Sequence, residues 1–374
     1  MQPPAPAPRD PLPERAAVIG AGLMGAGIAV VLAGGEHGIP HVTLRSRTGQ
    51  SISRARTRID GDVADLARHG LLAVDPATVH SRLRFTTSLP EAVSGVGLVN
   101  ESVTQDATTK RSLFSQLDAL VPPPAILAIT TSALSIAEFA GGVTHRDRVI
   151  IAHFLQPAHA LPVLEVVRGP ETSGETDTAM CAIWTALGRR PLGMRRDEPG
   201  FLLNRLQHAL VREAVRLLAE GLATAEDIDA AVTHGLAPRF VTAGPLRQRD
   251  VNGLAMHVKV ASRLWPELGM GDRASVPITF LKAIVDASGL GLENGRGFST
   301  WPDADPGAVR RKLDDERLAL VKSPHETVGC AEATPESRTD EGAHERLSQR
   351  IKCRGSSYRT RQQRPPTPRR KGQG

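Results

Sequence analysis

Residues 15–29 read RAAVIGAGLMGAGIA, and this stretch decides the fold. Its first five residues form a short apolar run that predicts a β-strand. Three glycines, Gly20, Gly22 and Gly25, follow with the spacing G-x-G-x-x-G, and the apolar residues after them predict a helix. A strand, a glycine turn and a helix in this order predict the first unit of a doubly wound α/β domain.

The glycine turn also predicts a ligand. Gly20 permits the tight turn, Gly22 lets the backbone approach a pyrophosphate, and Gly25 lets the helix pack against the strand. The phosphates would lie on free N–H groups at a helix N-terminus, where the helix dipole favours anions. We therefore predict a dinucleotide cofactor held at Gly20, Gly22, Leu23, Met24 and Gly25. The alternative is a glycine-rich turn that binds no ligand.

The rest of the chain divides into regions of different pattern. Strand-like and helix-like stretches alternate at first, which predicts a parallel sheet covered by helices, a Rossmann domain over residues 15–197. Apolar residues then recur at helical spacing and β-branched runs become rare, so residues 198–321 are predicted to form an all-α domain. The Pro-rich residues 1–14 and the aperiodic residues 322–374 are predicted to be a disordered lead and a disordered basic tail.

The second predicted strand, residues 42–44, ends without the acid that usually binds the adenosine ribose. Arg45, Ser46 and Arg47 occupy that place. Guanidinium groups bind phosphate with paired hydrogen bonds, so this set suits the 2′-phosphate of NADP. The alternative is that both arginines are solvated and that NAD binds without help from an acid. The predicted cofactor is therefore NAD, with NADP left open.

Composition and charge exclude several classes of protein. Residues 322–374 hold 12 basic and 6 acidic residues, which accounts for the whole net charge of +6 and leaves the folded body neutral, with no face for nucleic acid. Three cysteines far apart in sequence predict neither a disulfide framework nor a metal site, so a reducing cytoplasm is expected. No apolar run approaches the ~18 residues of a membrane span, and the Pro-rich start lacks the apolar core of a signal peptide.

One histidine stands where a catalytic group is expected. His153 follows the apolar residues 149–152, and the carboxyl ends of strands in a doubly wound sheet face the cofactor. Histidine titrates near neutral pH, which suits an acid/base catalyst. Glu165 lies on a second β-like run, residues 163–167, and a turn between the two runs would bring its carboxylate to the imidazole. The alternatives are a buried core histidine and a structural ion pair.

Several motifs occur in an order and at a spacing that resemble one family. They are VNESV at residues 99–103, TSAL at 131–134, HFLQP at 153–157, LEVV at 164–167 and PGFLLNR at 199–205. Together with the glycine turn, they resemble the L-3-hydroxyacyl-CoA dehydrogenase family, and most closely its branch with lambda-crystallin (L-gulonate 3-dehydrogenase) and L-carnitine dehydrogenase. The resemblance covers about residues 15–321. Gln156 and Thr130 depart from the family pattern, which has asparagine at both positions.

The resemblance implies roles for single residues. His153 would be the catalytic acid/base and Glu165 its partner, while Ser132 and Asn204 would contact the substrate. Glu101 would lie beside the cofactor, and so would a lysine on the helix that follows. The resemblance also implies a homodimer built through the helical domain.

Some of these residues have a plainer interpretation. Ser132 can cap the helix that follows it, and Asn204 can hydrogen-bond within its own helix. Lys110, the family lysine, can be a solvated surface residue. His159 can bind a substrate carboxylate or merely cover a turn.

The predicted function is that of an NAD(P)-dependent oxidoreductase that interconverts a 3-hydroxyacyl-CoA, or a related 3-hydroxy acid, and its 3-oxo product. Its expected partners are a small-molecule substrate and a second copy of the chain, with no metal ion and no membrane. Two alternatives stay open. One is a dehydrogenase of a free hydroxy acid similar to gulonate or carnitine, and the other is a non-catalytic cofactor-binding protein of the crystallin kind.

Overall fold

The computed structural model describes residues 12–131, 135–270, 275–298, 301, 305–309 and 311–313. The predicted tail, most of the predicted lead and Ser132 lie outside the described residues. The chain divides into two compact units, residues 1–211 and 212–374, and each unit is described by itself.

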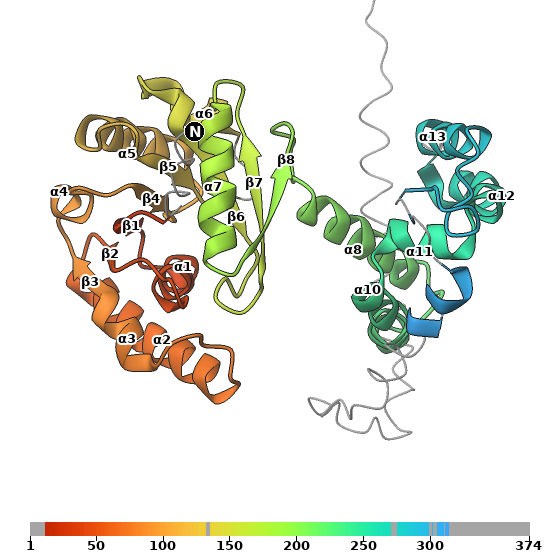
Figure 1. The fold of residues 1–374 in the computed structure, drawn as a ribbon, viewed down its shortest axis with the longest axis horizontal. Coiled ribbons are helices and arrows are strands. Elements are labelled where there is room, and N and C mark those ends of the chain that lie inside the picture. The colour runs from red at the N-terminus through yellow and green to blue at the C-terminus, as the bar shows by residue number, and fades with distance from the viewer. Residues whose placement is uncertain are drawn as a thin grey trace, which may run out of the picture. The chain divides into compact units, whose positions relative to one another are not determined.

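The first unit is built on one sheet whose strands run in the order β3-β2-β1-β4-β5-β6-β7-β8. The strands are β1 (Arg15–Ile19), β2 (His41–Arg45), β3 (Leu83–Thr86), β4 (Leu98–Glu101), β5 (Ile126–Ile129), β6 (Val149–Phe154), β7 (Val163–Arg168) and β8 (Arg190–Met194). Neighbours are parallel except β6 and β7, which form an antiparallel hairpin. The first six strands have the order of a Rossmann domain, so the predicted fold of this part is confirmed (Figure 1).

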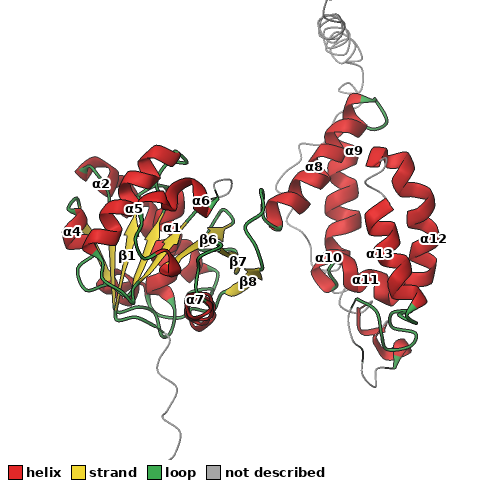
Figure 2. Ribbon diagram, turned by 90° about the horizontal axis from the view of Figure 1, so that it is seen from above, coloured by secondary structure: helices red, strands yellow, loops and turns green. Residues whose placement is uncertain are grey.

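Helices cover both faces of this sheet (Figure 2). They are α1 (Leu23–Gly34), α2 (Gly49–Arg68), α3 (Pro76–Arg82), α4 (Leu89–Ala92), α5 (Ala107–Leu120), α6 (Ile136–Phe139), η1 (Ala140–Gly142), η2 (Arg146–Arg148) and α7 (Gly174–Ala186). Successive residues of a strand face opposite sides, so Ala16 and Val18 pack in the core under α1, α2 and α7. Ala17 and Ile19 pack in the core under α4, α5 and α6.

Short polar side chains begin several of these helices. Thr48 accepts a hydrogen bond from the backbone N–H of Ser51 at the start of α2. Asp106 accepts from Thr109 at the start of α5, and Ser173 accepts from Thr176 at the start of α7. Each bond satisfies a helix N–H group that has no partner within the helix, and it sets where the helix begins.

The second unit is helical. It contains the C-terminal part of α8 (Leu203–Ala219), followed by α9 (Ala225–Ala230), η3 (Ala231–Leu236), α10 (Ala237–Thr242), α11 (Pro245–Asn252), α12 (Leu254–Trp265), η4 (Pro266–Met270) and α13 (Ser275–Asp286). Its small core is centred on Val251, Leu292 and Trp301. Buried Asp250 accepts a hydrogen bond from the N–H of Phe298 at 2.7 Å and so holds the loop after α13 against α11. The predicted all-α character of this part is confirmed.

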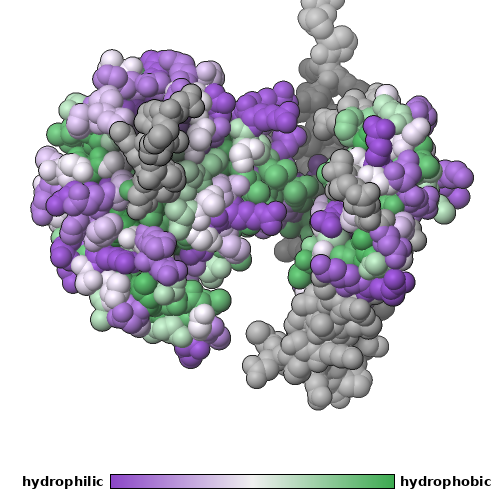
Figure 3. Space-filling view, viewed as in Figure 1, coloured by the Kyte–Doolittle hydropathy of each residue, from purple (hydrophilic) through white to green (hydrophobic). Residues whose placement is uncertain are grey.

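This unit leaves many large apolar side chains exposed. On α12, Met256, Val260 and Leu264 are 63%, 48% and 46% exposed, and Phe280 on α13 is 60% exposed. Apolar residues lie among polar ones on the face of the unit seen in Figure 3. None of the described helices is both long and apolar enough to cross a membrane.

Candidate active site

The glycine turn has the geometry of a phosphate cradle. Gly20 has φ +120°, and a side chain there would come within 2.3 Å of the carbonyl oxygen of Ser102. A side chain at Gly25 would come within 1.8 Å of the carbonyl oxygen of Gly20, so both positions require glycine. Gly22 precedes α1 without a side-chain cap, and a side chain there would meet nothing within 4 Å. The helix start therefore has no side-chain cap and has open space beside Gly22, which suits the approach of a pyrophosphate.

The end of β2 carries positive charge without a nearby acid. Arg45 donates from Nε to the carbonyl oxygen of Thr87 at 3.2 Å. Burial, and then repulsion from Arg47, lowers the pKa of Arg45. In the described part of the chain, no carboxylate forms an ion pair with either arginine. Two guanidinium groups that repel each other favour an anion between them.

Glu101 and Lys110 form a fully buried ion pair. Lys110 Nζ lies 2.8 Å and 2.6 Å from the two carboxylate oxygens of Glu101, and both side chains are 0% exposed. Burial raises the pKa of Glu101 and lowers the pKa of Lys110, because each charge has left water, while their mutual attraction acts the other way. Lys110 is thus no solvated surface lysine, and that interpretation is wrong. Glu101 ends β4, and Ser102 after it packs against the glycine turn.

His153 and Glu165 face each other across the hairpin of β6 and β7. They are register partners in this antiparallel pair. His153 Nδ1 lies 2.6 Å from Glu165 Oε2, with 6% of His153 and 0% of Glu165 exposed. The hairpin expected from the two apolar runs is thus present, and it places the carboxylate on the imidazole.

The second oxygen of Glu165 is also occupied. Oε1 accepts hydrogen bonds from the backbone N–H groups of Leu202 at 2.7 Å and Leu203 at 2.8 Å. Burial alone would raise the pKa of Glu165, but the hydrogen bonds from His153, Leu203 and Leu202 outweigh it, so the pKa lies below its usual value. An ionised Glu165 requires the proton of a neutral imidazole to be on Nδ1, which leaves Nε2 free to exchange a proton with a ligand.

The motif PGFLLNR at residues 199–205 supplies these N–H groups, although the sequence pointed only to its Asn204 as a site residue. Residues 199–203, called the 199–203 turn below, form the last part of the connection from β8 to α8 and include Leu203, the first residue of α8. Phe201 within it is 2% exposed, and its ring centroid lies 5.5 Å from that of His153. Backbone donors leave no mark on residue type, so only the consecutive Pro199 and Gly200 signal a turn here. Asn204 follows the bonded amides directly, within the first turn of α8.

Other candidates lie elsewhere. His159 Nδ1 is 3.3 Å from Asp62 Oδ2 on α2, so its imidazole attaches the β6–β7 turn to that helix. Thr130 is buried and accepts a hydrogen bond from Asn100 Nδ2 at 2.9 Å, which is a structural role. Ser132 lies outside the described residues. Among the residues described, no group of histidine, cysteine and acidic side chains could hold a metal ion.

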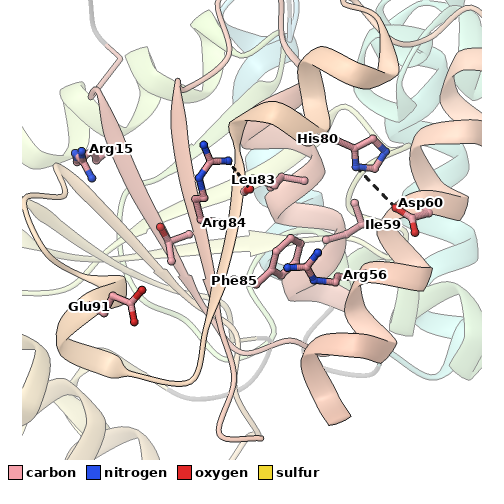
Figure 4. A pocket seen from close by; sticks show the side chains of 10 residues that line it. Arg15, Arg56, Ile59, Asp60, His80, Leu83, Arg84, Phe85 and Glu91 are labelled. Carbon is pink, nitrogen blue, oxygen red and sulfur yellow. Dashed lines mark hydrogen bonds and ion pairs between the residues drawn. The ribbon is translucent and has the colours of Figure 1, made fainter. Parts of the chain in front are cut away.

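A hollow of about 590 Å³ lies around β3 and α2 (Figure 4). It contains neither member of the His153–Glu165 pair. Some of its polar groups contact other lining residues: the Arg56 guanidinium lies 4.0 Å from the centroid of the Phe85 ring, and His80 Nδ1 lies 3.8 Å from Asp60 Oδ1.

Comparison with known proteins shows which family the sequence matches. The model of the 3-hydroxyacyl-CoA dehydrogenase NAD-binding domain matches residues 15–198, and the model of the C-terminal domain of the same enzymes matches residues 200–301. The matched families confirm the resemblance seen in the sequence, and L-carnitine dehydrogenases and lambda-crystallins of the expected branch are among the relatives.

Three relatives show the extent of the similarity. A 5-formyl-3-hydroxy-2-methylpyridine 4-carboxylate 5-dehydrogenase of Mesorhizobium japonicum is 31% identical, over 81% of this chain and 96% of its own. An L-carnitine dehydrogenase of Pseudomonas putida is 34% identical, over 82% of this chain and 92% of its own. The crystal structure of a 3-hydroxyacyl-CoA dehydrogenase from Archaeoglobus fulgidus has a TM-score of 0.68 at 26% identity, covering 82% of this chain and 98% of that one.

Proposed function

The chain belongs to the 3-hydroxyacyl-CoA dehydrogenase family, and from this membership we propose that it interconverts a 3-hydroxyacyl-CoA, or a related 3-hydroxy acid, and the 3-oxo product. His153 and Glu165 are the acid/base pair of this proposal. The observation that carries it is the buried contact of 2.6 Å between His153 Nδ1 and Glu165 Oε2.

The chemistry follows from which imidazole nitrogen is free. In the direction of oxidation, Nε2 of His153 takes the proton of the substrate hydroxyl group. The ionised Glu165 stabilises the resulting imidazolium and keeps the ring in one orientation. The nicotinamide cofactor, when bound, supplies the hydride chemistry. In the direction of reduction, Nε2 returns the proton to the oxygen of the 3-oxo group.

Other residues are proposed to hold the reactants. Ser132 and Asn204 hydrogen-bond the reacting oxygen of the substrate, and the position of Asn204 next to the bonded amides of the 199–203 turn supports its part. Glu101 and Lys110 border the cofactor, since the residue after Glu101 packs against the glycine turn.

Replacement of His153 tests the acid/base assignment. His153→Ala should lower kcat by at least about 10³-fold, because it removes the group proposed to take the proton, while cofactor affinity measured by fluorescence titration stays the same. His69→Ala, which removes an exposed histidine, is the control and should leave kcat unchanged. Near-normal turnover in His153→Ala would refute the assignment.

The cofactor is NAD or NADP, and Arg45 and Arg47 support binding of the 2′-phosphate of NADP. If they bind it, Arg45→Ala with Arg47→Ala should raise the KM for NADP by about tenfold or more, since hydrogen bonds to charged groups are worth about 1.5–3 kcal/mol. The KM for NAD should change little. Arg68→Ala at the far end of α2 is the control. A strong preference of the unaltered protein for NAD would reject the phosphate site.

The substrate class stays open between a CoA thioester and a free hydroxy acid. The L-carnitine dehydrogenase relative favours the second class, and the Archaeoglobus fulgidus relative favours the first. A panel of 3-hydroxy compounds, with NAD(P)H absorbance as the readout, separates them. Cofactor binding without turnover of any member would instead support a non-catalytic crystallin-like protein, which the paired His153 and Glu165 speak against.

A homodimer through the helical unit and a cytoplasmic location are also part of the proposal. The exposed apolar side chains of α12 and α13 support the first. The free thiol of Cys181 fits a reducing compartment.

A further inference from the structure

We propose that the 199–203 turn is a positioning element for the acid/base pair, and that Phe201 is a positioning residue for the imidazole of His153. The inference rests on the proposed function, because it assigns a role within the same site. No substrate contact is assigned to Phe201.

The backbone of Phe201 has a conformation that a bulky residue rarely adopts. Its φ is +45°, in the left-handed region, and the preceding Gly200 has φ +78°. Glycine adopts this region freely, whereas a phenylalanine there persists only where its surroundings compensate. The conformation turns the chain sharply between β8 and α8. Such outliers cluster at functional sites, and they persist where the contacts of the side chain offset the strain of the backbone.

The Phe201 side chain lies on the imidazole. Its ring centroid is 5.5 Å from that of His153, with an angle of 58° between the ring planes, and 2% of the residue is exposed. A ring packed at this distance limits rotation of the imidazole about its last side-chain bond. Rotation would take Nδ1 away from Glu165 and would misdirect Nε2. The contact therefore selects the orientation that the acid/base role requires.

The next two residues hold the other member of the pair. The backbone N–H groups of Leu202 and Leu203 both donate to Glu165 Oε1, while Oε2 receives Nδ1 of His153. One short turn thus places an apolar ring on the imidazole and two donors on the carboxylate. The sharp bend at Phe201 allows both contacts, because it reverses the chain between the ring and the amides.

Plain core filling is the competing explanation, since Phe201 also belongs to the core under α4, α5 and α6. The two explanations differ in what a change of side chain does. Core filling predicts a loss of stability alone. Positioning predicts a loss of kcat together with a weaker hydrogen bond between His153 and Glu165. Both effects should exceed those of another substitution in the same core that lowers stability equally.

Phe201→Leu and Phe114→Leu make a matched pair, because both phenylalanines are buried in the same core and Phe114 packs on Phe139 instead of His153. In Phe201→Leu, kcat should fall by about tenfold to a hundredfold, the cofactor Kd should stay constant, and the low-field proton resonance of His153 Nδ1–H should broaden. Phe114→Leu should lose a similar amount of thermal stability with kcat and the resonance unchanged. Unchanged kcat and an unchanged resonance in Phe201→Leu would overturn the proposal.

A second pair tests the amides and does not depend on the folding of Phe201→Leu. Proline is tolerated at the first position of a helix, so Leu203→Pro removes one donor to Glu165 with α8 kept, and Leu203→Ala keeps the donor. Loss of the donor raises the pKa of Glu165, so the acid limb of the pH–kcat profile should move to higher pH in Leu203→Pro alone. Identical profiles in the two variants would contradict the role of the turn.

These readouts separate the two proposals. Normal turnover in His153→Ala sinks the acid/base function, whereas the Nδ1–H resonance still reports on the turn without any turnover. If His153→Ala loses most of its kcat but Phe201→Leu changes neither kcat nor the resonance, only the positioning role is rejected.

Discussion

At the scale of single residues, the pair of Glu101 and Lys110 gives a direct test of buried charge. Lys110→Met should lower the free energy of unfolding by about 3–5 kcal/mol, because it leaves the Glu101 carboxylate buried without a partner. The double variant Lys110→Met with Glu101→Gln should be more stable than the single one, since no uncompensated charge remains. Urea denaturation of both variants measures the difference. Equal losses would mean that the two charges do not interact in the folded protein.

Residue patterns predicted part of this site and missed another part. The sequence predicts that His153 and Glu165 meet, because each lies on an apolar run and a turn separates the runs. The register of the two strands then places the residues opposite each other. The sequence does not decide whether Lys110 is buried, because a lysine on a helix looks the same whether its amine faces water or a carboxylate on the preceding strand. The backbone N–H groups of Leu202 and Leu203 donate to Glu165 whatever side chains these residues carry, so residue type could not predict them.

At the scale of elements, Asp118 ties α5 to the entry of β6, the strand that ends near His153. Its carboxylate accepts from Arg148 at 2.8 Å and from the N–H of Thr144 at 2.7 Å. Burial would raise the pKa of Asp118, but the bonds from Arg148, Thr144 and His145 outweigh it and lower the pKa to about 2. The folded pKa lies below the unfolded one, so this stabilisation is present above pH ~4 and disappears as the pH falls towards 2.

Asp118→Asn should therefore cost about 1–2 kcal/mol of unfolding free energy at pH 7, and this cost should shrink between pH 4 and 2. Thermal unfolding of wild type and variant across this range checks the sign. Asp65→Asn removes an exposed partner of Arg68 and should change stability by less than about 1 kcal/mol at any pH. A cost for Asp118→Asn that is constant with pH would show that its charge plays no part.

The order of strands and helices could be predicted where the apolar pattern and the turn residues indicate the same elements. The run at residues 15–29 gave strand, turn and helix, which are β1 and α1. The predicted domain limits remain predictions. The two matched family regions meet between residues 198 and 200, whereas the compact units divide within α8. This one helix begins at Leu203, whose N–H group donates to Glu165 in the first unit, and it continues into the helical unit.

At the scale of the whole molecule, the exposed apolar stripe of α12 predicts an interface with a second protein surface. Met256, Val260 and Leu264 follow at intervals of four residues on one side of the helix, and all three are exposed. Monomeric proteins seldom leave such stripes in water, and the cores of homodimer interfaces are rich in them. The helical unit is therefore where a second copy of the chain should bind.

Val260→Glu with Leu264→Glu should convert the protein from dimer to monomer, because two charges would be buried without partners in the interface. Sedimentation equilibrium would show the molar mass falling to that of one chain, 39.9 kDa. Lys259→Glu, on the same helix but outside the stripe, makes a comparable change of charge and should leave the dimer intact. Cofactor affinity should survive in the monomer, since the glycine turn lies wholly within the first unit. If the wild-type protein is a monomer at micromolar concentration, the stripe is not a dimer interface.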